Sequence, residues 1–546
     1  MNTRLPLSRA LAVAALLLVL VLAAAAVGLG RWFGQPPSRM GAASEPAEAL
    51  AQALDRALHR GTGNRSPGLA IRPLATDPTQ RDAASLALAV CDALARGLGQ
   101  LPDLRVASCA STRIATAAAL DNPRLGRLLD VGYLLDGRLD TLPDQRVQVR
   151  LALHDVKLGT TRWQIDETLP LSGLQTLPLR VAQETGQVVG QVASPSTETT
   201  LDPDSYTRWL QASQLARRPA NAERLQALQL VEQVLAAAPE HLPAQYLRLG
   251  LMSTLSTRAA GPAATGSARQ IETSQAELNA QILALGQHMV AQDPADWRGN
   301  ILLLNAAFGQ RRWADALDRA DALWRTRRHP GMLRIAANVY LSAGYLQRAQ
   351  SLLEDAARID ALDPSILALL ATVHGMRGDS AAMAELLTIA QQLGHRQLEL
   401  PLAMQALRRT DANTFEREAL AWAGSVENPA PWASAWVRGV LDPAARPAAR
   451  QALQQAEAPV KVQRAHFLPE YALLGDTPRS LQALTALAQQ PLAQWVDHLW
   501  WPEMAGVRSQ PGFGQAMAEQ GLTALWRVRG APDLCSQDGA GTWTCR

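Results

Sequence analysis

Two periodicities divide the chain into a mixed region and a long helical region. Between residues 67 and 192, short apolar runs with period-two alternation predict strands, and stretches of helical periodicity lie between them. We expect strands at residues 69–74, 104–107, 133–139, 147–153 and 161–168. We expect helices at residues 81–98, 122–129 and 174–192. This alternation predicts a small α/β domain over residues 67–192.

Beyond residue 200 the strand signals stop, and a repeat of about 34 residues replaces them. Residues of similar kind recur 34 positions apart in one order along the chain: Ala337 and Ala371, Tyr340 and His374, Gly344 and Gly378. Stacked helix pairs need small residues where two helices cross and Gly or Pro where they end. The pattern predicts an all-α solenoid of tetratricopeptide type over residues 200–500, clearest at 297–395, followed by a C-terminal cap at 501–546.

An uncharged apolar run occupies residues 10–30, long enough at about 1.5 Å per residue to cross a bilayer core of about 30 Å. Two interpretations stay open. An uncleaved transmembrane helix fits the length of the run, whereas a cleaved signal peptide would have a shorter apolar region. We expect the transmembrane helix, with residues 1–9 as a short cytoplasmic tail. Residues 31–66 then form a linker that includes a short amphipathic helix at 47–59.

Charge and composition exclude two classes of protein. The chain has 52 Lys and Arg against 49 Asp and Glu, so its net charge of +3 is not that of a nucleic-acid-binding polycation. A hydrophobic fraction of 48% is ample for buried cores and excludes intrinsic disorder over most of the chain.

Cysteine usage bears on the cellular compartment. The chain has 4 cysteines, an even and sparse set that fits an oxidising compartment. Cys535 and Cys545 are close enough in sequence to close a small loop, and we expect them to form a disulfide. The alternative is a set of buried or idle thiols. On the first interpretation, the bulk of the chain lies in the periplasm.

Residues 67–192 resemble the TolB amino-terminal-like domain of bacterial signalling proteins. The matching features are the strand LAIRPL, the helix that ends before LPDLRVAS, and the segments LLDVGYLLDGRLD and VQVRLALHDVKLGTTRWQIDETL. The resemblance implies an α/β module without known catalytic residues. In that family the module often stands beside tetratricopeptide repeats, behind a cytoplasmic winged-helix, kinase or nucleotide-cyclase domain. Residues 1–9 leave no room for such an effector, so we expect a single-pass bacterial inner-membrane protein that keeps only the extracytoplasmic part.

The C-terminal tail from Leu499 resembles the capping tail of the same repeat proteins, in the segments LWWPEM, QPGFGQ, QGLTALW and APDLC. The resemblance implies that the tail covers the apolar face of the last repeat.

Three polar residues fall where the first helix of each repeat would line the concave face of a solenoid. Asn305 and Asn338 occupy equivalent positions in successive repeats, and Arg334 stands one helical turn before Asn338. Repeat proteins that hold a peptide's terminal carboxylate use a basic residue and an Asn at this spacing, and Arg can donate two parallel hydrogen bonds to a carboxylate. The next repeat offers Ala368 and Thr372 instead. An ordinary polar groove is the plainer interpretation.

Eight of the 14 tryptophans follow residue 420 and include two groups: Trp422, Trp432 and Trp436, then Trp495, Trp500 and Trp501. Such residues serve either as aromatic anchors for a partner or as packing at helix junctions and in the cap, which we favour.

Motifs of catalysis and metal binding are missing, including H-E-x-x-H, G-x-x-x-x-G-K-[ST], G-x-S-x-G and C-x-x-C. We therefore expect a non-enzymatic, membrane-anchored periplasmic scaffold that needs no cofactor and binds a protein or peptide partner rather than nucleic acid. The alternative is a signalling or sensor component that acts through a separate regulator or kinase.

Overall fold

The computed structural model describes residues 49–50, 52–54, 56, 58, 67–79, 81–101, 103–116, 120–144, 146–192, 200–216, 220–259, 275–294, 296–326, 330–395, 397–423, 430–457, 467–489 and 496–546. The expected cytoplasmic tail (1–9), transmembrane helix (10–30) and most of the expected linker (31–66) lie outside these residues. Within the described ranges, no helix is both long enough and apolar enough to cross a membrane. Residues 50–546 form one unit, which is described below.

The α/β domain is built on a five-stranded sheet with the order β2-β1-β3-β4-β5. Its strands are β1 (Gly68–Ile71), β2 (Arg105–Ala107), β3 (Tyr133–Leu142), β4 (Arg146–Asp155) and β5 (Thr160–Pro170). Its helices are α3 (Arg81–Leu98), α4 (Cys109–Thr116), α5 (Asn122–Leu129), the 3-10 helix η1 (Leu171–Gln175) and α6 (Leu177–Val189). All five expected strands are confirmed, and so are the helices at 81–98 and 122–129.

Two helical segments of this domain differ from the expectation. Helix α4 was not expected, because its segment CASTRIAT has only one large apolar residue, Ile114, and therefore shows no apolar stripe. The helix expected at 174–192 is divided into η1 and α6, and a proline lies in the first turn of α6, where its missing N–H is tolerated.

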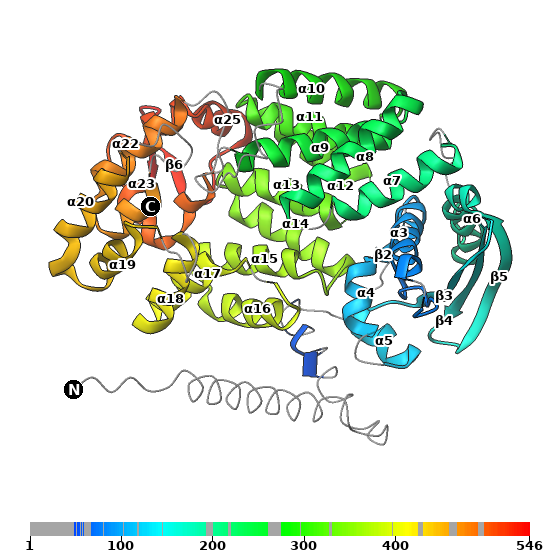
Figure 1. The fold of residues 1–546 in the computed structure, drawn as a ribbon. Coiled ribbons are helices and arrows are strands. Elements are labelled where there is room, and N and C mark those ends of the chain that lie inside the picture. Colours follow the sequence, from blue (N-terminus) through cyan, green and yellow to red (C-terminus); the bar gives the residue numbers. More distant parts are fainter. Residues whose placement is uncertain are drawn as a thin grey trace, which may run out of the picture. The chain divides into compact units, whose positions relative to one another are not determined.

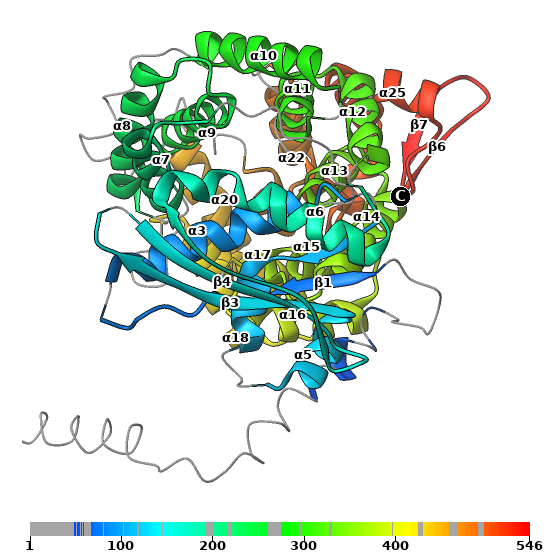
Figure 2. The same ribbon diagram turned by 90° about the vertical axis from the view of Figure 1, so that its right-hand side faces the viewer.

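The sheet is mixed in direction, and one of its faces has buried apolar side chains from β3 and β4. Strand β1 is parallel to β2 and β3, whereas β3, β4 and β5 form an antiparallel meander. Helices α3 and α6 cover one face of the sheet (Figure 2), where Leu139 and Val149 of the strands are buried with Leu94 of α3 and Val181 of α6. The period-two pattern in β4 is therefore the pattern of a strand with one face in the core.

A long array of helices follows the α/β domain. Its members are α7 (Pro203–Leu215), α8 (Asn221–Ala237), α9 (Leu242–Ala259), α10 (Gln275–Gln292), α11 (Trp297–Gly309), α12 (Trp313–Thr326), α13 (Pro330–Ser342), α14 (Leu346–Ile359), α15 (Pro364–Met376), α16 (Ser380–Gln392), α17 (Glu399–Arg408), α18 (Ala412–Ala423), α19 (Ala433–Leu441), η3 (Pro443–Ala445), α20 (Arg446–Glu457), α21 (Leu468–Leu473) and α22 (Thr477–Ala488). Successive helices pack as pairs, such as α13 with α14 and α15 with α16 (Figure 1).

The repeating glycines have a conformational role in this array. Gly344 and Gly378 follow the first helix of their pairs and have φ values of +88° and +84°. L-residues with a side chain adopt this left-handed region at a cost, so glycine is favoured at both turns. The glycine that recurs every 34 residues therefore marks the turn between the two helices of a pair.

The C-terminal segment, residues 496–546, contains η4 (Asp497–Trp500), η5 (Pro502–Met504), α23 (Ala505–Arg508), α24 (Phe513–Glu519), α25 (Leu522–Arg529), β6 (Cys535–Gln537) and β7 (Trp543–Cys545). Helix α24 packs against α22, the last long helix of the array. The same segment also reaches back to the middle of the array, where α25 contacts α12. There the indole Nε1 of Trp313 donates a hydrogen bond of 2.7 Å to the carbonyl of Gln520. The expected cover of the last repeat is thus only part of what this segment does.

Among the described residues, two places attach the α/β domain to the helix array. The first, which we call the apolar attachment, is a hydrophobic core shared by α3, α6 and the sheet with α7, α8 and α9. The second, which we call the polar joint, consists of Arg105, Ser108, Arg358 and Asp360. In it, β2 and the start of α4 contact the turn between α14 and α15.

Candidate partner-binding face

The three expected site residues lie on the first helices of two successive pairs. Asn305 lies on α11 and is exposed, whereas Arg334 and Asn338 lie on α13 and are half-buried. Helix α13 contacts both α11 and α15, so the first helices of three pairs lie next to one another. We call Asn305, Arg334 and Asn338 together the Arg334 face.

None of these three side chains forms a hydrogen bond or ion pair with another residue in the described part of the chain. Their neighbours in the array behave differently. For example, the Tyr340 hydroxyl donates a 2.6 Å hydrogen bond to Asp321, and the guanidinium of Arg348 lies 3.7 Å from the same carboxylate. The donors of Arg334 and Asn338 are therefore unpaired within the described residues. Because the two residues are one helical turn apart, they share one side of α13.

Charges of both signs act on His395, which is close to Arg334. Burial lowers the pKa of His395, and the positive charge of Arg334 lowers it further. Asp363 and Glu399 act in the opposite direction on the same imidazole. Arg334 and His395 are thus within electrostatic range of each other.

The arrangement does not continue into the next pair. On α15 the equivalent positions are Ala368, which is buried, and Thr372, whose hydroxyl donates to the carbonyl of Ala368. A carbonyl within its own helix therefore already accepts the Thr372 hydroxyl proton. The polar contacts offered by the Arg334 face come from α11 and α13.

The tryptophans of the C-terminal half are mainly core residues. Trp436, Trp500 and Trp501 are at most 1% exposed, and Trp432 is 7% exposed. Trp422 is half-buried, and its ring centroid lies 5.8 Å from that of Trp436. This burial fits packing at helix junctions better than a free aromatic surface. Trp495 lies outside the described residues.

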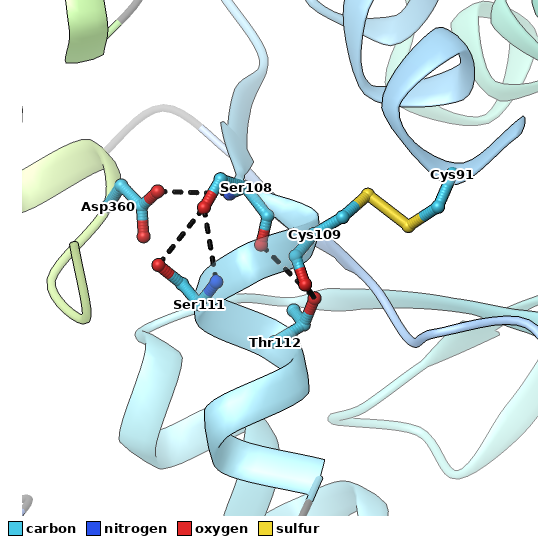
Figure 3. Close-up of a disulfide and its surroundings, with 6 residues drawn as sticks. All are labelled: Cys91, Ser108, Cys109, Ser111, Thr112 and Asp360. Atoms are coloured by element: carbon cyan, nitrogen blue, oxygen red, sulfur yellow. Dashed lines mark hydrogen bonds between the residues drawn. A yellow bond between two sulfur atoms is a disulfide. The ribbon is translucent and has the colours of Figure 1, made fainter. Parts of the chain in front are cut away.

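The structure pairs all four cysteines. Cys535 is bonded to Cys545, which closes the ends of strands β6 and β7 into a small hairpin. Cys91 of α3 is bonded to Cys109, the first residue of α4 (Figure 3). The second pair could not be assigned from the sequence, because nothing in the 18-residue spacing shows that α4 exists or that it starts beside α3.

Few side chains in the described residues are placed to bind a metal ion or to act as an acid–base pair. No cluster of three or more His, Cys, Asp or Glu side chains within the described ranges could hold a metal ion. His154 and Asp136 do meet on the polar face of the sheet, with 3.1 Å between Nε2 and Oδ1. Neighbouring strands bring them together, since Asp136 lies opposite Ala152 and Leu134 opposite His154. Both side chains are partly exposed, and a single pair of this kind is typical of a solvated sheet face.

No pattern in the sequence indicates the polar joint. Asp360 and Ser108 are 252 positions apart, and each alone is consistent with an ordinary helix-end residue. Only the packing of the turn between α14 and α15 against α4 brings the two residues together.

Comparison of the sequence with protein-family models and with curated proteins finds no match.

Proposed function

We propose that this protein is a membrane-anchored periplasmic scaffold that binds a protein or peptide partner through the Arg334 face. On this proposal, residues 10–30 anchor the chain in the inner membrane, the α/β domain is of the TolB amino-terminal-like type, and the helix pairs are tetratricopeptide repeats. No catalytic step is assigned to the protein.

One observation carries the choice of binding surface. Arg334 and Asn338 present hydrogen-bond donors one turn apart on a helix of the array, and no described residue is paired with them. A guanidinium that can donate two parallel hydrogen bonds, beside a side-chain amide, suits a carboxylate group. The proposed partner segment therefore carries an acidic side chain or a free C-terminus.

Capture of the partner from membranes tests the proposal. A photo-crosslinking residue placed at Asn305 should form an adduct with the partner, and Arg334→Glu should abolish the adduct because it places like charge beside the partner's anion. The matched control is Arg409→Glu at the end of α17. This arginine is exposed, and no described residue forms a hydrogen bond or ion pair with it through the side chain. Arg409→Glu changes an exposed side chain and should cost within about 0.5 kcal/mol. Arg334→Glu changes a half-buried side chain, so circular dichroism must show the helix content of the parent in both variants.

The two variants separate a specific contact from general charge attraction. If charge steering alone mattered, both substitutions would reduce the adduct similarly, and high salt would remove the difference from the parent. An unchanged adduct in Arg334→Glu would show that this face does not bind the partner.

The location is tested separately. A reporter that is active only outside the cytoplasm, fused after Arg546, should be active, and the full-length protein should stay with the membranes. Recovery of a shortened soluble species would support a cleaved signal peptide instead of an anchor.

A further inference from the structure

Asp360 is a fully buried acidic residue at the polar joint. It follows α14, and its side chain turns toward the first turn of α4 in the α/β domain (Figure 3). The residue is 1% exposed. Its Oδ2 accepts a 3.1 Å hydrogen bond from the backbone N–H of Ser108, whereas its Oδ1 is buried without a hydrogen-bond partner in the described residues.

Burial is the dominant influence on this carboxyl group. It raises the pKa of Asp360, and the nearby negative charge of Asp363 raises it further, while the hydroxyls of Ser111 and Ser108 act to lower it. The start of α4 favours an anion, but one backbone hydrogen bond and the two nearby hydroxyls compensate only in part for the loss of water around a charge.

The charged groups around the joint do not neutralise Asp360 directly. The guanidinium of Arg105 on β2 donates to the carbonyls of Arg358 and Asp130, at 2.7 and 2.9 Å. On α14, Arg358 forms ion pairs with Asp355 and Glu354. On α15, Asp363 accepts from the backbone N–H of Ser365, and on α4 Arg113 is exposed. Among the described residues, none of these cations forms an ion pair with Asp360.

We propose that the polar joint is a proton-dependent contact, which is closed when Asp360 is protonated and loosens when Asp360 is ionised. A protonated carboxyl group keeps the acceptor for Ser108 and removes the buried charge. Closing the joint therefore takes up a proton. The surface that opening would uncover includes β2, the start of α4 and the turn between α14 and α15.

The direction of the pH effect follows from the raised pKa. A group that binds its proton more tightly in the closed state stabilises that state fully below its ordinary pKa, about 4 for aspartate. This contribution is lost as the pH rises through the pKa of the closed joint. The joint is therefore tightest in acid and weaker near neutrality.

Two features confine the change to the joint. The apolar attachment to α7, α8 and α9 depends on hydrophobic burial, which carries no such proton dependence. The disulfide between Cys91 and Cys109 ties the start of α4 to α3, so α4 stays in the α/β domain when its contact with Asp360 is lost. Opening is then a movement of the α/β domain about the apolar attachment.

Hydrogen exchange of the full-length chain in detergent micelles tests this proposal. The readout is the protection of backbone amides in residues 105–116, corrected for the intrinsic pH dependence of exchange, between pH 4.5 and pH 7.5. The parent should lose protection severalfold as the pH rises. Asp360→Asn, which is neutral and has the same shape, should stay protected over the whole range.

A second aspartate provides the control. Asp379 also accepts a backbone N–H at a helix start, from Ala382, but its side chain is 50% exposed. Asp379→Asn should leave the pH profile of residues 105–116 as in the parent. A pH-independent profile in the parent would overturn the proposal, whether or not the variants fold. Lower protection in Asp360→Asn than in the parent at neutral pH would also overturn it, because it would show that the carboxylate charge holds the joint closed.

Discussion

The indole Nε1 of Trp526 donates a 3.0 Å hydrogen bond to the carbonyl of Ala343, a residue 183 positions earlier in the chain. Trp526 belongs to α25, and Ala343 follows α13 at the turn before α14. The bond is one of several that hold the C-terminal segment against the middle of the array. The Tyr345 hydroxyl donates to the carbonyl of Gly530, and the Gln347 backbone N–H donates to Asp533, both at 2.9 Å.

Because the C-terminal segment packs against the middle of the array, the helix pairs there have contacts beyond those with their neighbouring pairs. A helix array is stabilised mainly by contacts between neighbouring pairs, so its ends usually open first. Here the last helices are tied to α12, α13 and α14 by buried indoles and by an ion pair between Arg529 and Asp318. The helices of the C-terminal segment and the middle of the array should therefore unfold together.

Removing the Trp526 donor should cost more than removing an indole of similar burial that has no partner. In Trp526→Phe the buried carbonyl of Ala343 loses its hydrogen bond, at a cost of about 1–3 kcal/mol beyond the loss of packing. The control is Trp500→Phe, because Trp500 is 0% exposed and its Nε1 has no hydrogen-bond partner in the described residues. Thermal unfolding of both variants checks the difference. Equal destabilisation would show that the hydrogen bond contributes nothing net.

The two left-handed glycines allow a matched comparison. Alanine at Gly378 would meet only backbone strain, since no atom of the described residues other than its chain neighbours lies within 4 Å of a Cβ built there, and the expected cost is about 1–2 kcal/mol. Alanine at Gly344 would meet the same strain, and in addition its Cβ would lie 2.8 Å from the Trp500 ring.

Gly344→Ala should therefore be worse than Gly378→Ala by about 1–3 kcal/mol, the usual cost of overpacking. The difference between the unfolding midpoints of the two variants measures this extra cost. Fluorescence of the C-terminal tryptophans should change in Gly344→Ala only. If both variants lose the same stability, Trp500 is not held against this turn.

The Cys535–Cys545 disulfide should affect the hairpin more than the array. Replacing both cysteines by serine opens a loop of 10 residues, worth about 2–3 kcal/mol by the chain-entropy argument. Limited proteolysis should then cut after residue 530, while the unfolding midpoint of the array changes little. Protein taken from the periplasm without reductant should have no free thiol at either position. Two free thiols in that protein would show that the disulfide does not form, and would weaken the inference that the bulk of the chain lies in the periplasm.

The other disulfide offers a contrast. Cys91 and Cys109 are 0% and 1% exposed and lie in the core that joins the α/β domain to α7, α8 and α9. Serine at both positions should destabilise the α/β domain as a whole, since it removes the link and buries two hydroxyl groups.

The sequence by itself determined the local elements of this protein. Alternation in residues 147–153 predicted β4 because a strand with one buried face repeats every two residues, and the stripe in residues 81–98 predicted α3 because a helix repeats every 3.6. The glycines that recur 34 positions apart located the turns at Gly344 and Gly378, because the left-handed backbone there favours glycine. The i, i+4 spacing also placed Arg334 and Asn338 on one side of one helix.

Only the tertiary structure decided which distant segments meet. Asp360 with Ser108, and Trp526 with Ala343, are contacts across 252 and 183 positions, and neither residue type nor spacing encodes them. Their physical basis is the packing of whole elements, which places a helix start or a turn against a surface formed elsewhere in the chain. The same packing left Arg334 without a partner among the described residues while it buried Trp436, Trp500 and Trp501. Local periodicity could not distinguish these outcomes, because it records which side of an element is apolar and not what covers it.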